Sequence, residues 1–245
     1  MTQQETLKNI LQGVKTCAIA GHVNPDGDCI GSCMGMYLYL KENYPEIRTE
    51  VYLQKPRDVF FFIEDLALAK EKYNGDSYDL LILCDISSKD RIGVAGAALR
   101  HAARTICLDH HKTNPGGFDL FVNVPEASSA SEVVFRHLEP EKISRSCAEA
   151  LYTGIVHDTG VFQYSSTSPE TMRIAAVLME KGIDFSSIID ESYYQKTEAQ
   201  NRVMGRVVMD SSLYLDGKVI VGIADREIME TYHVSAKDMD GIVNQ

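Results

Sequence analysis

The first two-thirds of this chain alternates apolar, strand-like runs with segments of helical periodicity, and this alternation constrains the fold most strongly. The runs with strand character are Thr16–Ala20, Arg48–Leu53, Leu80–Cys84 and Thr105–Leu108. Helical patterns extend from about Cys29 to Asn43 and occupy the stretches near 129–138, 144–157 and 168–181. Strands separated by helices predict a parallel sheet covered on both faces, so we expect an α/β fold.

The character of the sequence changes after Gly182. A polar helical pattern predicts a linker helix over residues 186–205. Two segments, Val207–Leu215 and Lys218–Ala224, then flank the turn Asp216-Gly217, and together they form a hairpin signal. We therefore expect a large domain over residues 1–185, the linker helix, and the start of a smaller α/β domain over residues 206–245, a length at the lower limit for an independent core.

The composition is that of a globular protein that stays in a reducing compartment. Apolar residues make up 44% of the 245 residues, yet no run approaches the roughly 18 apolar residues of a membrane span. The polar start, MTQQETLKNILQG, lacks the features of a signal peptide, so we expect a cytoplasmic protein without membrane association. No CxxC pair occurs, and we interpret the cysteines as small core residues: Cys17, Cys29, Cys33, Cys84, Cys107 and Cys147.

The net charge of −11 limits the class of partner. An acidic protein is unsuited to coating long nucleic acid through its whole surface, because phosphate binding depends on Lys and Arg. A short anionic substrate remains compatible with this charge, since bound metal ions can supply positive charge locally.

His and Asp residues gather in four clusters at the ends of apolar or helical segments. The clusters read HVNPDGD at 22–28, LLILCD ending at Asp85, CLDHH at 107–111 and VHDTG at 156–160. The carboxyl ends of parallel strands meet at one edge of a sheet, so the first three clusters should converge on one crevice. Asp158 ends a helical pattern, and its carboxylate can point back into the same crevice.

So many carboxylates and imidazoles around one point predict bound cations. Without a cation, the aspartates would repel one another at a cost in stability. Their oxygens are hard ligands, and His22 and His110 add imidazole, a mixture that suits Mn²⁺ best, with Mg²⁺, Co²⁺ or Zn²⁺ as alternatives. Two such ions together can catalyse the cleavage of phosphoesters.

Some of these residues taken alone have an ordinary structural explanation, whereas Asp109-His110-His111 is harder to explain without a bound ligand. Asp85 could be a turn residue, and an isolated His22 would be structural. We interpret His101, His137 and His233 as surface or structural residues, because they have no carboxylate neighbours in the sequence. His157 should face away from Asp158 on a helix and is left unassigned. The joint pattern is much more specific than any of its members.

The segments HVNPDGDCIGS, the strand end at Asp85, LDHHKTN and GIVHDTGVF together resemble the four signature motifs of the DHH phosphoesterase superfamily. The match is in order and covers about residues 15–165. The arrangement is similar to the bacterial nanoRNase/pAp phosphatase branch, and residues 206–245 resemble the start of its C-terminal DHHA1 domain. The glycine-rich GGGH-type motif of that domain does not occur after Asp225, so the resemblance implies an incomplete DHHA1 domain.

The resemblance implies a role for each matching position. The implied metal ligands are His22 and Asp26 on one ion, Asp28, His110 and Asp158 on the other, and Asp85 bridging both. His111 matches the histidine that contacts the scissile phosphate, and Asp109 matches a residue that orients the histidines.

These positions together imply a two-metal-dependent phosphoesterase. Its expected substrates are short oligoribonucleotides, linear dinucleotides such as pApA, or pAp. One alternative is a manganese-dependent inorganic pyrophosphatase, although the basic SRKKQ-type motif of that group does not occur here. The other alternative is a nucleotide-binding module without activity. A homodimer is left open.

Overall fold

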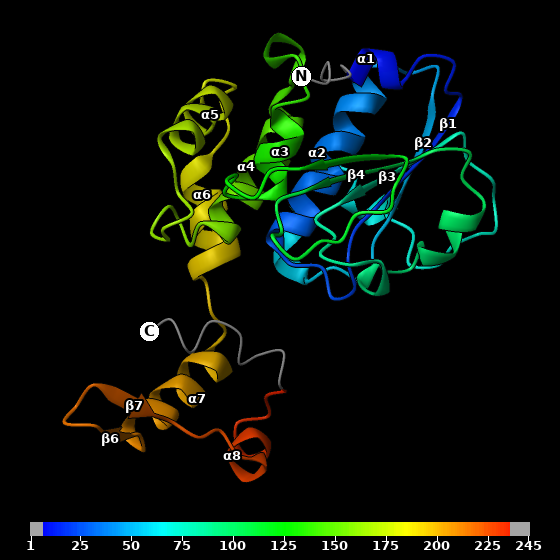
Figure 1. The fold of residues 1–245 in the computed structure, drawn as a ribbon. Helices are drawn as coiled ribbons and strands as arrows, with labels where there is room; N and C mark the ends of the chain where they lie inside the picture. The colour runs from blue at the N-terminus through cyan, green and yellow to red at the C-terminus, as the bar shows by residue number, and fades with distance from the viewer. Residues whose placement is uncertain (1–6, 236–245) are drawn as a thin grey trace. The chain divides into compact units, whose positions relative to one another are not determined.

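The computed structural model describes residues 7–235, which fall into two compact units that divide between Tyr193 and Tyr194 (Figure 1). The expected small domain over 206–245 extends beyond the described residues at its end. Its assignment as a DHHA1-like domain, and the boundaries that we expect at 185 and 205, stay predictions.

The first unit is built on a five-stranded sheet in which every neighbouring pair of strands is parallel. Its strands are β1 (Thr16–Ala20), β2 (Arg48–Tyr52), β3 (Leu80–Cys84), β4 (Thr105–Asp109) and β5 (Leu120–Asn123). Their order across the sheet is β2-β1-β3-β4-β5. The expectation of an α/β fold with a covered parallel sheet is confirmed.

Both faces of the sheet are buried, as the apolar runs predict. Alternate residues of each strand point to opposite faces, so Cys17 and Ile19 belong to one core cluster while Ala18 and Ala20 belong to another. The first face packs against the α-helices α2 (Gly27–Asn43), α3 (Ala130–Phe135) and α4 (Arg145–Asp158) (Figure 1). The second face packs against shorter segments that include the 3₁₀ helix η4 (Gly96–Arg100).

Helices α2 and α4 pack unusually closely beside the sheet. A Cβ atom built on Gly31 would lie 2.5 Å from the carbonyl oxygen of Ala150 and 2.7 Å from the backbone nitrogen of Gly154. The lack of a side chain at Gly31 therefore lets the two backbones approach. This contact matters for the site, because the first turn of α2 and the last turn of α4 carry functional residues.

The strand order places a topological switch point at the carboxyl edge of the sheet. The connection from β1 leads through α2 to β2 on one side, whereas β3 lies on the other side of β1. The chain segments that leave β1 and β3 diverge, and ligands bind at such switch points in open α/β sheets.

The remaining helices of the first unit are α1 (Leu7–Ile10), α5 (Pro169–Met179) and α6 (Phe185–Ile189). Ser168 begins α5 with a capping box, in agreement with the predicted helix start. The stretch 186–205, where we expect a linker helix, contains α6, a π-helical turn at Asp190–Tyr194 and part of α7 (Glu198–Met209), with residues 195–197 outside any helix.

The second unit contains the predicted hairpin, but its strands are shorter than expected. The hairpin pairs β6 (Ser212–Tyr214) with β7 (Val219–Val221), and α8 (Arg226–Thr231) follows it. The prediction of strand from Val207 was wrong, because residues 207–209 continue α7. Val203 and Val207, four residues apart, are buried on one side of that helix.

Two further expectations concern the chain as a whole. All six cysteines are buried and free, which confirms their interpretation as core residues. Among residues 7–235, no helix is both long enough and apolar enough to cross a membrane.

Candidate metal centre

The carboxyl edge of the sheet brings the predicted residues of four sequence segments together. His22 and Asp26 follow β1, Asp85 follows β3, and Asp109 ends β4. The other predicted residues are Asp28 in the first turn of α2, His110 and His111 directly after β4, and Asp158 at the end of α4.

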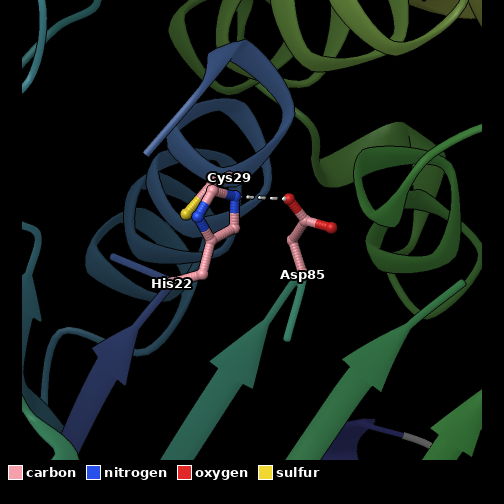
Figure 2. Close-up of side chains that lie close together, drawn as sticks. All are labelled: His22, Cys29 and Asp85. Atoms are coloured by element: carbon pink, nitrogen blue, oxygen red, sulfur yellow. Dashed lines mark ion pairs between the residues drawn. The ribbon is translucent and has the colours of Figure 1, made fainter. Parts of the chain in front are cut away.

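His22 is oriented by its own loop. Its Nδ1 lies 2.7 Å from the carbonyl oxygen of Val23, so this nitrogen donates a hydrogen bond and Nε2 faces the carboxylates of the cluster. Nε2 lies 3.2 Å from Oδ2 of Asp85 and 3.6 Å from Oδ2 of Asp26. Figure 2 shows the ring of His22 facing the carboxylate of Asp85. The arrangement is typical of a metal-binding histidine, whose second nitrogen is held by a backbone carbonyl.

Asp85 occupies the middle of the cluster. Its Oδ2 faces His22, while its Oδ1 lies 3.6 Å from Nε2 of His110 and 3.5 Å from Nδ1 of His111. The residue is only 3% exposed. One carboxylate therefore offers an oxygen to each side of the cluster, as a bridging ligand must.

The backbone of Asp85 adopts the left-handed conformation, with φ of 58°. Asp and Asn tolerate this conformation better than other residues with a side chain. The backbone amide of Asp85 donates to the carbonyl oxygen of Leu108 on β4, at a nitrogen–oxygen distance of 3.1 Å, and this hydrogen bond holds the backbone in place. Such conformations are enriched where the chain aims a functional side chain.

His110 lies among three carboxylates on the other side of the cluster. Besides Asp85, its Nε2 is 3.6 Å from Oδ2 of Asp158 and 3.8 Å from Oδ2 of Asp28. Asp158 lies where the sequence predicts it. Its carboxylate points from the end of α4 toward the strand ends.

Two aspartates of the β1–α2 segment are fixed by backbone amides. Oδ1 of Asp26 accepts from the amides of Asp28 and Cys29 and so caps α2. The carboxylate of Asp28 accepts from the amides of Ala130 at 2.6 Å and Ser131 at 2.9 Å, at the start of α3. Asp28 is 2% exposed, whereas the side chain of Asp26 is 64% exposed. The cluster is thus closed on the Asp28 side and open on the Asp26 side.

A chain of hydrogen bonds supports His111. Its Nδ1 donates to Oδ1 of the buried Asp109 at 2.8 Å, and Nδ2 of Asn114 donates to the other oxygen of Asp109 at 2.7 Å. Asn114 is held in turn, because its Oδ1 accepts from the amide of Gly116. Nε2, on the far edge of the His111 ring, is directed away from Asp109 and can meet a substrate.

The carboxylates control the charge of the histidines. Burial alone would lower the pKa of His22, but the carboxylates of Asp26 and Asp85 outweigh burial and hold that pKa well above its usual value. Burial also opposes the charged form of His110, and the surrounding carboxylates raise its pKa to about 10. Without a cation, the imidazoles compensate the buried negative charge.

The histidines do not compensate the charge of every aspartate to the same extent, so the pKa values of the aspartates shift in different directions. Burial and the charges of its neighbours raise the pKa of Asp28 well above its usual value, and burial raises that of Asp158 to about 6. Burial opposes the charged form of Asp85 as well, but His110 and His22 hold its pKa below the usual range. A bound dication would stabilise all three carboxylates in their charged form.

The spacing of the donor atoms fits bound cations. Ligand atoms at about 2.1 Å from one ion lie roughly 3.0–3.5 Å from one another. The His–Asp separations of 3.5–3.8 Å are too long for hydrogen bonds but close to this spacing. Three groups of donors lie within 4.8 Å, and they are His22–Cys29–Asp85, Asp85–His110–His111 and Asp28–His110–Asp158.

These groups can be compared with the ligands that the sequence predicts. The third group consists of the three residues expected on one ion, and Asp85 is common to the other two groups. The first group contains Cys29, which the sequence analysis places among the core cysteines. The helical, apolar surroundings of Cys29 gave no signal of a donor, whereas Asn114 lies inside LDHHKTN and could have been found from that motif.

The other histidines lie outside these groups. His157, left unassigned from the sequence, packs beside Gly27 and lies 3.0 Å through Nε2 from Oγ of Ser192. Its ring also contacts Phe60 and Tyr193 at centroid distances of 5.0 and 5.4 Å. His157 therefore faces away from the cluster that its neighbour Asp158 joins.

An open parallel sheet with imidazole and carboxylate donors at its carboxyl edge defines an α/β protein with the donor set of a metal-dependent hydrolase. The chain belongs to the DHH family, because the family's N-terminal domain matches residues 16–155, more than half of the sequence. The expected family is thereby confirmed.

Relatives and solved structures agree with this membership. The chain is 28% identical to the bifunctional oligoribonuclease and PAP phosphatase NrnA of Bacillus subtilis over 234 residues, which cover 93% of this chain and 72% of the relative. It is 30% identical to the NrnA of Thermus thermophilus over 210 residues, covering 82% of this chain and 61% of the relative. The expectation of an enzyme of the phosphodiesterase and phosphatase class is confirmed at the level of the family.

The fold is also found in crystal structures. An exopolyphosphatase-related protein from Bacteroides fragilis superposes with a TM-score of 0.89 at 27% identity, over 97% of this chain and 74% of that one. A Methanococcus jannaschii protein described as a candidate family II inorganic pyrophosphatase superposes with a TM-score of 0.55 at 20% identity, over 89% of this chain and 75% of that one. The second likeness concerns the fold alone.

Proposed function

We propose that this chain is a two-metal phosphoesterase that hydrolyses short oligoribonucleotides, linear dinucleotides such as pApA, or pAp. The observation that carries the proposal is the position of Asp85, whose two oxygens face His22 on one side and His110 on the other. The names of the relatives, oligoribonuclease and PAP phosphatase, support these substrates.

The proposed ligands divide between two cations. One cation would be held by His22, Asp26 and Asp85, and the other by Asp28, His110, Asp158 and Asp85. The donor chemistry favours Mn²⁺, with Mg²⁺ or Co²⁺ as alternatives, because hard oxygens are combined with imidazole. Bound in this way, the cations would supply an activated water and neutralise charge on the phosphoryl group.

The side chains around the cations would position the substrate and manage protons. Asp109 holds Nδ1 of His111 at 2.8 Å and raises the pKa of this imidazole, so the protonated ring can donate from Nε2 to a phosphoryl oxygen. The open side next to Asp26 would admit the phosphate, since the carboxylate of Asp26 is the most exposed of the proposed metal ligands. The net charge of −11 favours short substrates over long strands.

The first prediction tests this assignment with Asp85→Asn. Asn tolerates the left-handed backbone and keeps the size of the side chain, but it removes the charge shared by both cations. We expect hydrolysis of pApA in Mn²⁺ to fall by at least about 10³-fold, because the metals contribute several kcal/mol to catalysis. Cys33→Ala is the control, since Cys33 is buried in the same unit and belongs to none of the donor groups among the described residues.

The substrate is tested on a panel of labelled compounds: pAp, pApA, RNA of two to five nucleotides, and pyrophosphate. We expect turnover of the nucleotides with Mn²⁺ and none of pyrophosphate. Turnover of pyrophosphate alone would identify a pyrophosphatase instead. Tight binding of pApA without turnover in excess Mn²⁺ would identify a binding module, and equal activity of Asp85→Asn and the control would contradict the metal assignment.

A further inference from the structure

Cys29 lies where a soft ligand would meet the cation proposed at His22 and Asp85. One donor atom from each of these three residues lies within 4.8 Å of the other two, and all three residues are buried. Figure 2 shows the sulfur of Cys29 beside the ring of His22, with Asp85 across from it. Among residues 7–235, none of the other five cysteines belongs to a donor group of this kind.

The backbone around Cys29 keeps the thiol in this position. Cys29 occupies the first turn of α2, and its amide donates to Oδ1 of Asp26 at 3.0 Å, so one capping contact fixes both residues. A Cβ atom on Gly21 would lie 2.2 Å from Sγ of Cys29. The lack of a side chain at Gly21, directly before His22, therefore makes room for the thiol next to the histidine.

Thiolate ligands change the preference of a metal site. Oxygen and imidazole donors accept Mg²⁺ and Mn²⁺, whereas a thiolate favours Zn²⁺, Co²⁺ and Cd²⁺ over these harder ions. A metal–sulfur bond of about 2.3 Å and a metal–nitrogen bond of about 2.1 Å are compatible with donors less than 4.8 Å apart.

We propose that Cys29 is a further side-chain ligand of the cation held by His22 and Asp85, and that it biases this position toward thiophilic divalent ions. This inference rests on the proposed function, because it requires a cation at that position. On binding, the bond between Sγ and the metal replaces the S–H bond and the proton leaves to solvent, so no oxidant or reductant is needed.

The test is cobalt binding followed by absorption spectroscopy on the full chain. We expect metal-free protein titrated with Co²⁺ to develop a near-ultraviolet thiolate-to-cobalt charge-transfer band. The band should disappear in Cys29→Ala and persist in Cys33→Ala, which removes a neighbouring buried thiol one turn along α2. Cys29→Ser, which keeps the size of the side chain, should also lack the band and guards against a folding defect in the alanine variant.

Affinity gives a second readout that does not depend on activity. Binding of Cd²⁺ should weaken by at least about 10–100-fold in Cys29→Ala, while binding of Mn²⁺ changes much less. Cobalt bound at normal stoichiometry without a thiolate band would overturn the role of Cys29 and leave the metal centre intact. A chain that binds no Co²⁺ at all would overturn the metal centre itself, so the two failures are distinguishable.

Discussion

Asp109 shows how a single buried carboxylate can orient its neighbours within the candidate site. Its two oxygens accept from His111 and from Asn114, and the residue is fully buried. The hydrogen bond to Nδ1 selects the tautomer of His111 and the orientation of its ring. Asn114 is therefore a positioning residue that acts on His111 through Asp109.

Replacement of Asn114 by Ala should lower kcat by roughly 10–100-fold, the usual effect of removing a partner that orients a functional histidine. KM and the affinity for Mn²⁺ should change much less, because Asn114 contacts no proposed metal ligand in the described hydrogen bonds. The measurement is steady-state hydrolysis of pApA with Mn²⁺ titration.

Asn43→Ala is the matched control for that experiment, because Asn43 donates to backbone carbonyls of Tyr39 and Lys142. A loss of kcat as large in Asn43→Ala as in Asn114→Ala would indicate general destabilisation. It would contradict a specific role in orienting His111.

Most of the candidate site could be predicted from the sequence because its residues sit at recognisable places. His22, Asp85 and Asp109 follow or end apolar runs, and parallel strands carry such residues to one edge. Cys29 could not be found in this way, since a cysteine in an apolar helix is ordinarily a core residue. Its position depends on the space left by Gly21, a three-dimensional contact with no signature in the sequence.

At the scale of elements, the strands β1 to β4 could be predicted from the sequence and β5 could not. The predicted and observed bounds agree for β1 and β3, whose residues, apart from the half-buried Thr16, are apolar and buried on both faces. β5 was missed because its four residues, LFVN, are all half-buried at the edge of the sheet. A short edge strand has neither a continuous apolar run nor a clear alternation, so its pairing with β4 is visible only in the fold.

The contact between α2 and α4 leads to a prediction at the same scale. Gly31→Ala should destabilise the first unit by about 1–3 kcal/mol, because the added methyl group meets the backbone of α4 rather than a movable side chain. This strain should exceed the gain of about 1 kcal/mol from replacing Gly in a helix. Thermal unfolding should show a decrease in Tm of roughly 2–12 °C.

The matched substitution is Gly96→Ala in η4. A Cβ atom there meets only Ile92 at ordinary contact distances of 3.8 and 3.9 Å. Its effect on stability should stay within about 0.5 kcal/mol. If Gly31→Ala unfolds at the same temperature as the unsubstituted chain, close backbone packing does not define the position of α2.

At the scale of the whole molecule, the charge cluster links metal binding to stability. A cation that binds only the folded chain stabilises it by about 2.7 kcal/mol when its concentration is 100 times Kd. Mn²⁺ should therefore raise Tm by roughly 5–10 °C, and a chelator should reverse the shift. Differential scanning calorimetry of the metal-free and Mn²⁺-loaded chain measures this directly.

Asp85→Asn serves as the control for the stability experiment. It removes the buried carboxylate that pairs with His22 and His110 when no cation is bound, so the metal-free variant should be less stable than the unsubstituted protein. Its Tm should respond little to Mn²⁺. A melting temperature of the unsubstituted chain that ignores both Mn²⁺ and chelator would argue against a cation at this edge of the sheet.

Because all five strands run in one direction, the loops that enter them open at the edge opposite the donor cluster. The exposed loop at residues 74–75, shortly before β3, belongs to that opposite edge, and no atom of residues 7–235 lies within 4 Å of a Cβ atom built on Gly75. A short peptide label inserted there should leave hydrolysis unchanged. Such a handle would let the protein be tethered to a sensor surface with its reactive side turned toward the solution.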